Sequence, residues 1–302
     1  MSKLSIIALG NYCQAVDVEE DQKLPDLKSV LKQECGIVMR RITRMTQLAL
    51  LGSSRCKGEI KLPKNTGVYF CSCRGDTGVT VDLLDELVKR REPPSPLTFV
   101  NSVSNAASFY VAKIFDLHDR SHFITNRFDP IAAALKTAQL DLESGEIQAA
   151  LVGSVDCCSL PLSDHKRRLE IDPKTVVGEA SHWLLLTKAA EKEPLGGSLG
   201  DITRLKNFSD LGSLLIFLEA EISSKTSVFV EFGQHVLEMD KKTIVETVND
   251  AKVLNYRETL PHYDSQTASG IMQFLELKER GTLFHINSDP AGRFSLIEIE
   301  VK

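Results

Sequence analysis

The sequence predicts an α/β fold built from layers of helices and strands. Strand-like and helix-like segments alternate through both halves of the chain, which is typical of helices packed on sheets. Residues 149–155 and 183–186 are continuous apolar runs, as expected for strands that are buried on both faces. A chain of 302 residues is also long enough to bury a large core in one or two domains.

The first elements follow from the spacing of apolar residues. We expect a strand at 4–9 and a helix at 39–51, where apolar side chains recur on one side. A short buried strand at 67–73 should precede a helix at 79–91, whose basic end suits a helix C-terminus. The prolines within 93–96 then end that helix.

The middle of the chain carries the clearest local signals. A helix is expected at about 105–115 and a strand at 121–125. Asp129 is a good N-cap and Pro130 suits the first position of the next helix, which should stop before Gly145.

A polar segment at 189–199 contains Gly and Pro and predicts a boundary between two halves, residues 1–190 and 191–302. The second half repeats the alternation of strands and helices. Its expected elements are helices near 209–223 and 241–250, a strand at 226–232, a helix at 265–280 closed by Gly281, and two final strands around a turn at 288–292.

Composition excludes several classes of function. With 36 basic and 41 acidic residues the net charge is −5, which argues against a protein that coats nucleic acid. No apolar run approaches the ~20 residues that span a bilayer, and the N-terminus lacks the pattern of a signal peptide. The seven Cys residues form no zinc-like pairs, so we expect a cytoplasmic protein without a metal or a cofactor.

A family resemblance rests on several short motifs in a fixed order. They are Pro96–Phe99, Ser102–Ala106, Leu142–Gly145, Ala150–Asp156, Val177–Ala180, Phe229–Gln234, Thr267–Gly270 and the terminal hairpin at 282–297. In this order the chain resembles the β-ketoacyl-ACP synthases, condensing enzymes of the thiolase fold. The resemblance implies a layered α-β-α-β-α architecture with two related halves, of which the second is shortened.

The same resemblance locates the four positions that ketosynthases use in catalysis. The family places a Cys at a helix N-terminus, where the thiolate is favoured, and adds two His and a Lys. The matching positions here carry Phe128, Phe232, Thr259 and Asp264. None of these four can replace the family's residue, so the resemblance implies that the chain has no ketosynthase site of its own.

A ketosynthase-like chain without catalytic residues is similar to a chain-length factor of aromatic polyketide or aryl polyene systems. The resemblance implies a heterodimer with an active ketosynthase in fatty acid, polyketide or aryl polyene synthesis. The helix at about 105–115 and the following strand would form the pairing surface. Four aromatic residues would line or plug the acyl tunnel: Phe109, Tyr110, Phe115 and Phe128.

Two basic clusters are candidates for docking an acidic acyl carrier protein, because basic patches steer acidic partners. One is Lys166, Arg167 and Arg168, and the other is the run 89–91. Each is also the ordinary composition of a solvated helix face.

Other functions remain open at this point. Cys157 or Cys158 is a possible relocated nucleophile of an acyltransferase or thioester hydrolase. A shift of two positions would put His262 in place of Asp264 and restore one histidine. A homodimeric scaffold that binds acyl carrier protein is a further alternative.

Overall fold

The two halves of the chain place their strands in the same order. The sheet runs β3-β2-β4-β5-β1-β6-β10-β9-β7-β8, so β8-β7-β9-β10-β6 repeats β3-β2-β4-β5-β1. Within each half, the two pairings nearest the edge are parallel and the next two are antiparallel. The expectation of two related halves is therefore confirmed, while the division at residue 190 stays a prediction.

The computed structural model describes all residues except 1–2, 18–22, 104, 192–194, 226 and 250. The strands are β1 (Leu4–Val16), β2 (Thr66–Ser72), β3 (Ser121–Thr125), β4 (Ala149–Asp156), β5 (Val177–Lys188), β6 (Gly200–Phe208), β7 (Val228–Phe232), β8 (Lys252–Val253), β9 (Gly281–Ser288) and β10 (Phe294–Val301). The helices are α1 (Leu27–Cys35), α2 (Arg44–Lys57), α3 (Thr77–Leu84), α4 (Pro96–Asn101), α5 (Ala106–Ile114), α6 (Pro130–Ser144), α7 (Leu162–Leu169), α8 (Leu211–Ile222), α9 (Glu238–Thr247) and α10 (Thr267–Leu277). None of the helices within these described ranges is long and apolar enough to cross a membrane.

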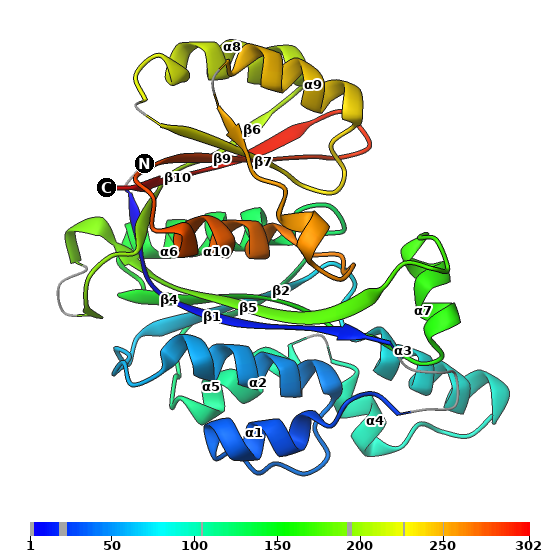
Figure 1. The fold of residues 1–302 in the computed structure, drawn as a ribbon. Helices are drawn as coiled ribbons and strands as arrows, with labels where there is room; N and C mark the ends of the chain where they lie inside the picture. The colour runs from blue at the N-terminus through cyan, green and yellow to red at the C-terminus, as the bar shows by residue number, and fades with distance from the viewer. Residues whose placement is uncertain (1–2, 18–22, 104, 192–194, 226, 250) are drawn as a thin grey trace.

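Helices and sheet halves alternate in five layers (Figure 1). Helices α6 and α10 lie between the two halves of the sheet, α2 and α5 cover the outer face of the first half, and α8 and α9 cover the second. The predicted α-β-α-β-α architecture is therefore confirmed.

The middle layer forms the largest continuous core. Helix α6 buries the apolar residues that its spacing predicts, and α10 faces it with a second apolar stripe. The buried residues of α6 in this core are Ile131, Ala134, Leu135, Ala138 and Leu142, each fully shielded from solvent. This packing holds the N-terminus of α6 against the second half of the chain.

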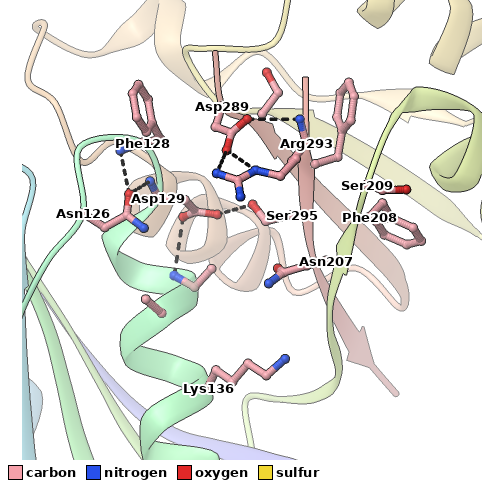
Figure 2. Close-up of a pocket in the computed structure, with 14 residues that line it drawn as sticks. Asn126, Phe128, Asp129, Lys136, Asn207, Phe208, Ser209, Asp289, Arg293 and Ser295 are labelled. Carbon is pink, nitrogen blue, oxygen red and sulfur yellow. Dashed lines mark hydrogen bonds and ion pairs between the residues drawn. The ribbon is translucent and has the colours of Figure 1, made fainter. Parts of the chain in front are cut away.

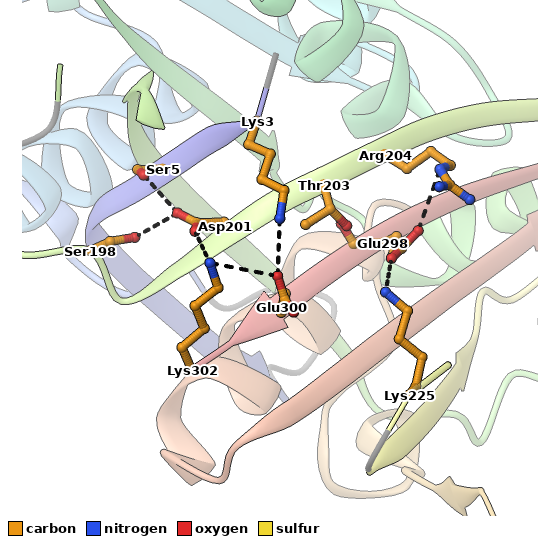
Figure 3. A network of polar contacts seen from close by, with 10 residues as sticks. All are labelled: Lys3, Ser5, Ser198, Asp201, Thr203, Arg204, Lys225, Glu298, Glu300 and Lys302. Carbon is orange, nitrogen blue, oxygen red and sulfur yellow. Dashed lines mark hydrogen bonds and ion pairs between the residues drawn. The ribbon is translucent and has the colours of Figure 1, made fainter. Parts of the chain in front are cut away.

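The sheet halves join where β1 pairs with β6 over three residues. Ser5 Oγ donates a 2.6 Å hydrogen bond to Asp201 Oδ1, and Lys3 forms an ion pair with Glu300 (3.2 Å) (Figure 3). Lys225 Nζ lies 2.8 Å from the buried Glu298 carboxylate, so both of these glutamates of β10 are paired with lysines along this junction.

Several predicted boundaries are wrong for physical reasons. The last helix ends at Leu277 and not at Gly281, because Lys278 adopts the left-handed conformation of a C-cap. The helix expected at 39–51 begins at Arg44, where Thr43 caps it. The strand expected at 4–9 continues to Val16, and a π-helical turn replaces the α-helix expected after Leu84.

Candidate functional site

The candidate site is built around the N-terminus of α6. After β3, the Asn126 carboxamide accepts hydrogen bonds from the backbone N–H groups of Phe128 (2.9 Å) and Asp129 (3.3 Å). Asp129 then caps the helix through Ala132 N, and Pro130 occupies the first turn, where its missing N–H has no consequence. These local rules fix the backbone at position 128, where the family resemblance predicts the position of the nucleophile.

The second half of the chain closes over this helix end. Asn287 Nδ2 on β9 donates a 2.7 Å hydrogen bond to the Phe128 carbonyl oxygen. Ser295 on β10 donates one to Asp129 Oδ2 (Figure 2). Gly233 is required beside them, since a Cβ there would lie 2.4 Å from the Asn287 side chain. The helix N-terminus is thus bonded to both strands of the terminal hairpin.

A cleft of about 590 Å³ opens beside this helix end (Figure 2). It lies between α6, the end of β6 and the terminal hairpin. Its lining residues are Asn126, Phe128, Asp129, Ala132, Ala133, Lys136, Asn207, Phe208, Ser209, Ser288, Asp289, Arg293, Phe294 and Ser295. Arg293 is ion-paired with Asp289 across 2.6 Å, so one of the two cations that line the cleft is already neutralised.

Burial governs the charge of Asp129. It raises the pKa of Asp129 to about 6, although the Ser295 hydroxyl and the Ala132 N–H stabilise the carboxylate. The carboxyl group of an Asp in the unfolded chain has a pKa near 3.8. The ionised side chain therefore destabilises the folded state increasingly between these two pH values.

We expect Asp129→Asn to stabilise the protein at neutral pH, by on the order of 2 kcal/mol, because Asn still caps the helix but carries no charge. Asp129→Ala is the matched variant. It should be less stable than Asp129→Asn by about 1 kcal/mol, since the cap is lost. Urea unfolding at pH 4 and pH 7 measures both differences. If the stability gained by Asp129→Asn does not increase from pH 4 to pH 7, the raised pKa of Asp129 is contradicted.

The structure brings together only two of the four matched positions. The ring of half-buried Phe128 meets the edge of the His235 ring at a centroid distance of 5.2 Å. Asp264 lies in the same polar region, where its charge acts on the pKa of His235. Phe232 instead packs in the core beneath α8 and α9, and Thr259 is exposed at the end of a 3-10 turn.

Asp264, predicted to stand at the family's second histidine position, forms an ion pair. Arg74 Nε lies 2.5 Å from Asp264 Oδ2, and both side chains are largely shielded. The adjacent Asp156 accepts hydrogen bonds from Ser72 and Ser265, and burial followed by the Asp264 charge raises its pKa. The carboxylate of Asp264 is thus already paired within the chain.

His262 lies beside this arrangement. Its backbone bonds to Val176 O and Gly178 N, which fixes it at the start of β5. Burial lowers its pKa, and the charges of Asp264 and Arg74 also act on it. Among the described residues no group of acidic, Cys and His side chains could hold a metal ion.

Sequence reasoning missed the residues that face Phe128. His235, Asn287 and Ser295 come from three different segments, and Arg74 follows β2. Their neighbours along the chain give no signal, because each contact joins residues more than a hundred positions apart. Only the pairing of β7, β9 and β10 places them together.

The two candidate nucleophilic cysteines are poorly placed for that role. Cys157 and Cys158 are both buried, and Cys158 Sγ donates a hydrogen bond to Gly178 O (3.2 Å). Burial raises the pKa of both thiols. Their thiolate forms, which would be the nucleophiles, are therefore disfavoured.

The cluster at 166–168 makes contacts of its own on α7. Lys166 Nζ donates to Pro173 O (2.6 Å), and Arg167 pairs with Asp164 (2.7 Å). Arg168 turns inward and donates to Ser159 Oγ (2.5 Å). Arg167 is the most exposed of the three, so docking at this cluster stays a prediction that relies mainly on one side chain.

The predicted tunnel residues lie on two sides of the first sheet half. Phe109, Tyr110 and Phe115 belong to α5 and its end in the outer helix layer, whereas Phe128 lies at α6 in the middle layer (Figure 1). Phe109 is 57% exposed, while Tyr110 and Phe115 pack at the edge of the outer core. Of these residues only Phe128 lines the cleft.

Comparison with known families gives one match. Residues 12–156 match the family model of the β-ketoacyl synthase N-terminal domain. Comparison with curated proteins gives no match.

Solved structures match over the whole chain. The ishigamide ketosynthase/chain length factor aligns with a TM-score of 0.77 at 14% identity, covering 99% of this chain and 99% of that chain. The type II PKS acyl-carrier protein in complex with its ketosynthase, AntDE:AntF, gives 0.73 at 13%, covering 100% and 99%. The oxazolomycin ketosynthase domain OzmH KS7 of Streptomyces albus JA3453 gives 0.75 at 11%, covering 100% and 75%. The fold is thus the thiolase fold of ketosynthases.

Proposed function

We propose that this chain is a non-catalytic subunit that pairs with an active β-ketoacyl synthase, because it has the thiolase fold of ketosynthases and its residues 12–156 match the β-ketoacyl synthase N-terminal domain. The observation that carries the proposal is the phenylalanine at the α6 N-terminus, where a condensing enzyme needs a thiolate. The Phe128 side chain has no titratable or nucleophilic group, and the charge of Asp264 is neutralised by Arg74. A partner would therefore supply the chemistry.

The edge of the sheet supports pairing. β3 is an edge strand, so one side of its backbone has no neighbouring strand. Unpaired strand edges are sites at which another chain adds to a sheet. Nine exposed large apolar side chains of the described residues lie within 84–114, and α5, which packs beside β3, carries Phe109 and Ile114 among them. Such surfaces mark protein interfaces.

Two of the similar structures support a ketosynthase and an acyl carrier protein as partners. One describes a ketosynthase/chain length factor, and another an acyl-carrier protein in complex with its ketosynthase. By this proposal the chain completes a ketosynthase dimer in polyketide-type synthesis and meets an acyl carrier protein. The buried, high-pKa thiols of Cys157 and Cys158 speak against the alternative of a thioester hydrolase.

Co-expression with an active ketosynthase of the same organism tests the pairing. We expect a heterodimer by size-exclusion chromatography with light scattering, and Phe109→Asp should weaken it by more than about tenfold, because interface aromatics are frequent hot spots. Leu237→Asp is the matched control, since Leu237 is 64% exposed before α9 on the opposite side of the fold. A homodimer that excludes the ketosynthase would overturn the proposal and favour a scaffold.

We further propose that Phe128 bounds the space open to a growing acyl chain. Its ring lines the cleft and is braced by His235, so Phe128→Ala removes volume without disturbing the capped helix. We expect longer products at an unchanged condensation rate, measured by mass spectrometry of the products of the heterodimer. Met239→Ala, at an exposed position on α9 and outside the proposed pairing surface, is the control. Identical product lengths for Phe128→Ala and the native heterodimer would refute the role.

A further inference from the structure

A second concave surface lies on the outer helix layer, away from the α6 N-terminus. A groove of about 450 Å³ separates α1 from the segment at 37–42. Its floor is apolar: Leu31 and Ile42 are buried and Ile37 is half-buried. Val38 on its rim is 73% exposed. An apolar floor of this size is typical of ligand or peptide sites.

Cations flank the groove on both sides. Lys28 and Lys32 lie one helical turn apart on α1, and Arg40 and Arg41 lie on the opposite wall. All four are exposed, and none forms an ion pair in the part of the chain that the structure describes. In a chain with a net charge of −5, this is a concentrated basic surface, and Asp26 at the N-cap of α1 acts on the charge of Lys28 only.

The walls of the groove are fixed in place. Asp26 caps α1 through Lys28 N and Ser29 N, and the Gly36 C-cap closes it. Arg41 adopts a left-handed backbone conformation with a φ of 62°, which costs about 1 kcal/mol or more for a residue with a side chain. Asn101 Nδ2 donates to the Arg41 carbonyl and holds the turn. The strained turn keeps two adjacent arginines on the rim.

We propose that this groove binds an acidic amphipathic helix of a partner protein. The apolar face of such a helix would fill the floor, and carboxylates on both of its flanks would meet the two rows of cations. A single-chain lipid or fatty acid brings one anionic head and would leave most of the four cations unpaired. Charge complementarity along both walls therefore favours a helix as the occupant. This proposal does not depend on the proposed pairing with a ketosynthase through β3.

The probe is a fluorescein-labelled synthetic helix of roughly 18 residues with Leu on one face and Glu on both flanks. Binding to the full chain is followed by fluorescence anisotropy. We expect saturable binding that weakens when NaCl rises from about 50 mM to about 500 mM. Lys32→Glu combined with Arg40→Glu should weaken it by about tenfold or more, because two attractive pairs become repulsive.

A control double variant, a scrambled control peptide and a hydrogen-exchange measurement complete the test. Lys174→Glu combined with Arg280→Glu changes the net charge equally at exposed positions outside the groove and should leave affinity unchanged. Added helix should protect backbone amides of 27–42 from hydrogen exchange. Equal loss of affinity in both double variants, or equal binding of a scrambled peptide, would overturn the proposal. Binding of myristate or phosphatidylglycerol vesicles, but not of the helix, would also overturn it and assign the groove to a lipid.

Discussion

Replacing Glu231 by Gln is expected to stabilise the protein by on the order of 3 kcal/mol at pH 7. Glu231 lies on β7, fully buried, and neither of its carboxyl oxygens has a hydrogen-bond partner among the described residues. Burial raises the pKa of Glu231 to about 8. An unfolded Glu ionises near 4.5, so at pH 7 unfolding releases a proton and is favoured by that release.

The neighbours of Glu231 explain why it stays without a charge partner. His285 on β9 lies directly opposite it in the register, but burial lowers the pKa of His285 to about 3, so it is neutral at pH 7. Gly270 on α10 packs against the carboxyl group, leaving no room for another side chain. Gln has nearly the same shape as the protonated Glu, so this replacement removes only the ionisation of the unfolded chain.

The pH dependence is the signature of this effect. Below pH 4.5 both states are protonated and the two proteins should be equally stable. As the pH rises from 4.5 to 8, the advantage of Glu231→Gln should grow, and above pH 8 it should stay constant because the native Glu231 is then ionised as well. Urea unfolding at several pH values across this range gives the curve directly.

Glu276→Gln is the matched control, because Glu276 is exposed on α10. That variant should unfold at the same urea concentration as the native protein at every pH. Equal stability of Glu231→Gln and the native protein at pH 8 would show that Glu231 finds a partner and is charged in the folded state.

Local signals in the sequence predicted the segment that carries the site. The strand Ser121–Thr125 and the helix Pro130–Ser144 agree with expectation at both ends. The reason is that Asp129, Pro130 and Gly145 act on the backbone next to them, and these capping rules need no tertiary contact. The layered fold is also confirmed, and residues 12–156 match the model of the β-ketoacyl synthase N-terminal domain.

Elements without such signals were missed. Helix α7 is short and half of its residues are charged, so it shows no apolar stripe in the sequence. Strand β6 alternates irregularly, and it is recognisable only because β1 and β10 pair with it. In both cases tertiary pairing, and not local propensity, decides the structure.

The site itself depends on contacts that no local pattern encodes. Asn287 and Ser295 reach Phe128 and Asp129 across about half the chain. The assignment of Asp264 to a catalytic position of the family stays a prediction, and its pairing with Arg74 could not be predicted from the sequence. The side chains that meet around Phe128 and Asp264 are thus decided by tertiary contacts.

The largest functional effect we expect is the absence of acyl loading on this chain. In the heterodimer incubated with acylated carrier protein, intact-mass spectrometry should find every covalent acyl group on the ketosynthase partner. Loss of an enzyme's nucleophile lowers turnover by on the order of 10⁶-fold, so the chain alone should show no measurable condensation. The physical reason is that Phe128 occupies the helix end where a thiolate would be stabilised.

Phe128→Cys is the positive control for position. It places a thiol beside the cleft, and we expect it to gain one alkylation by iodoacetamide that the native protein lacks. The native thiols Cys157 and Cys158 should stay unmodified in the folded chain, because both are buried and their thiolate forms are disfavoured. An acyl group on either of these cysteines would contradict the non-catalytic role. It would also show that burial does not exclude the thiolate at the end of β4, and thioester chemistry would then belong to this chain and not to its partner.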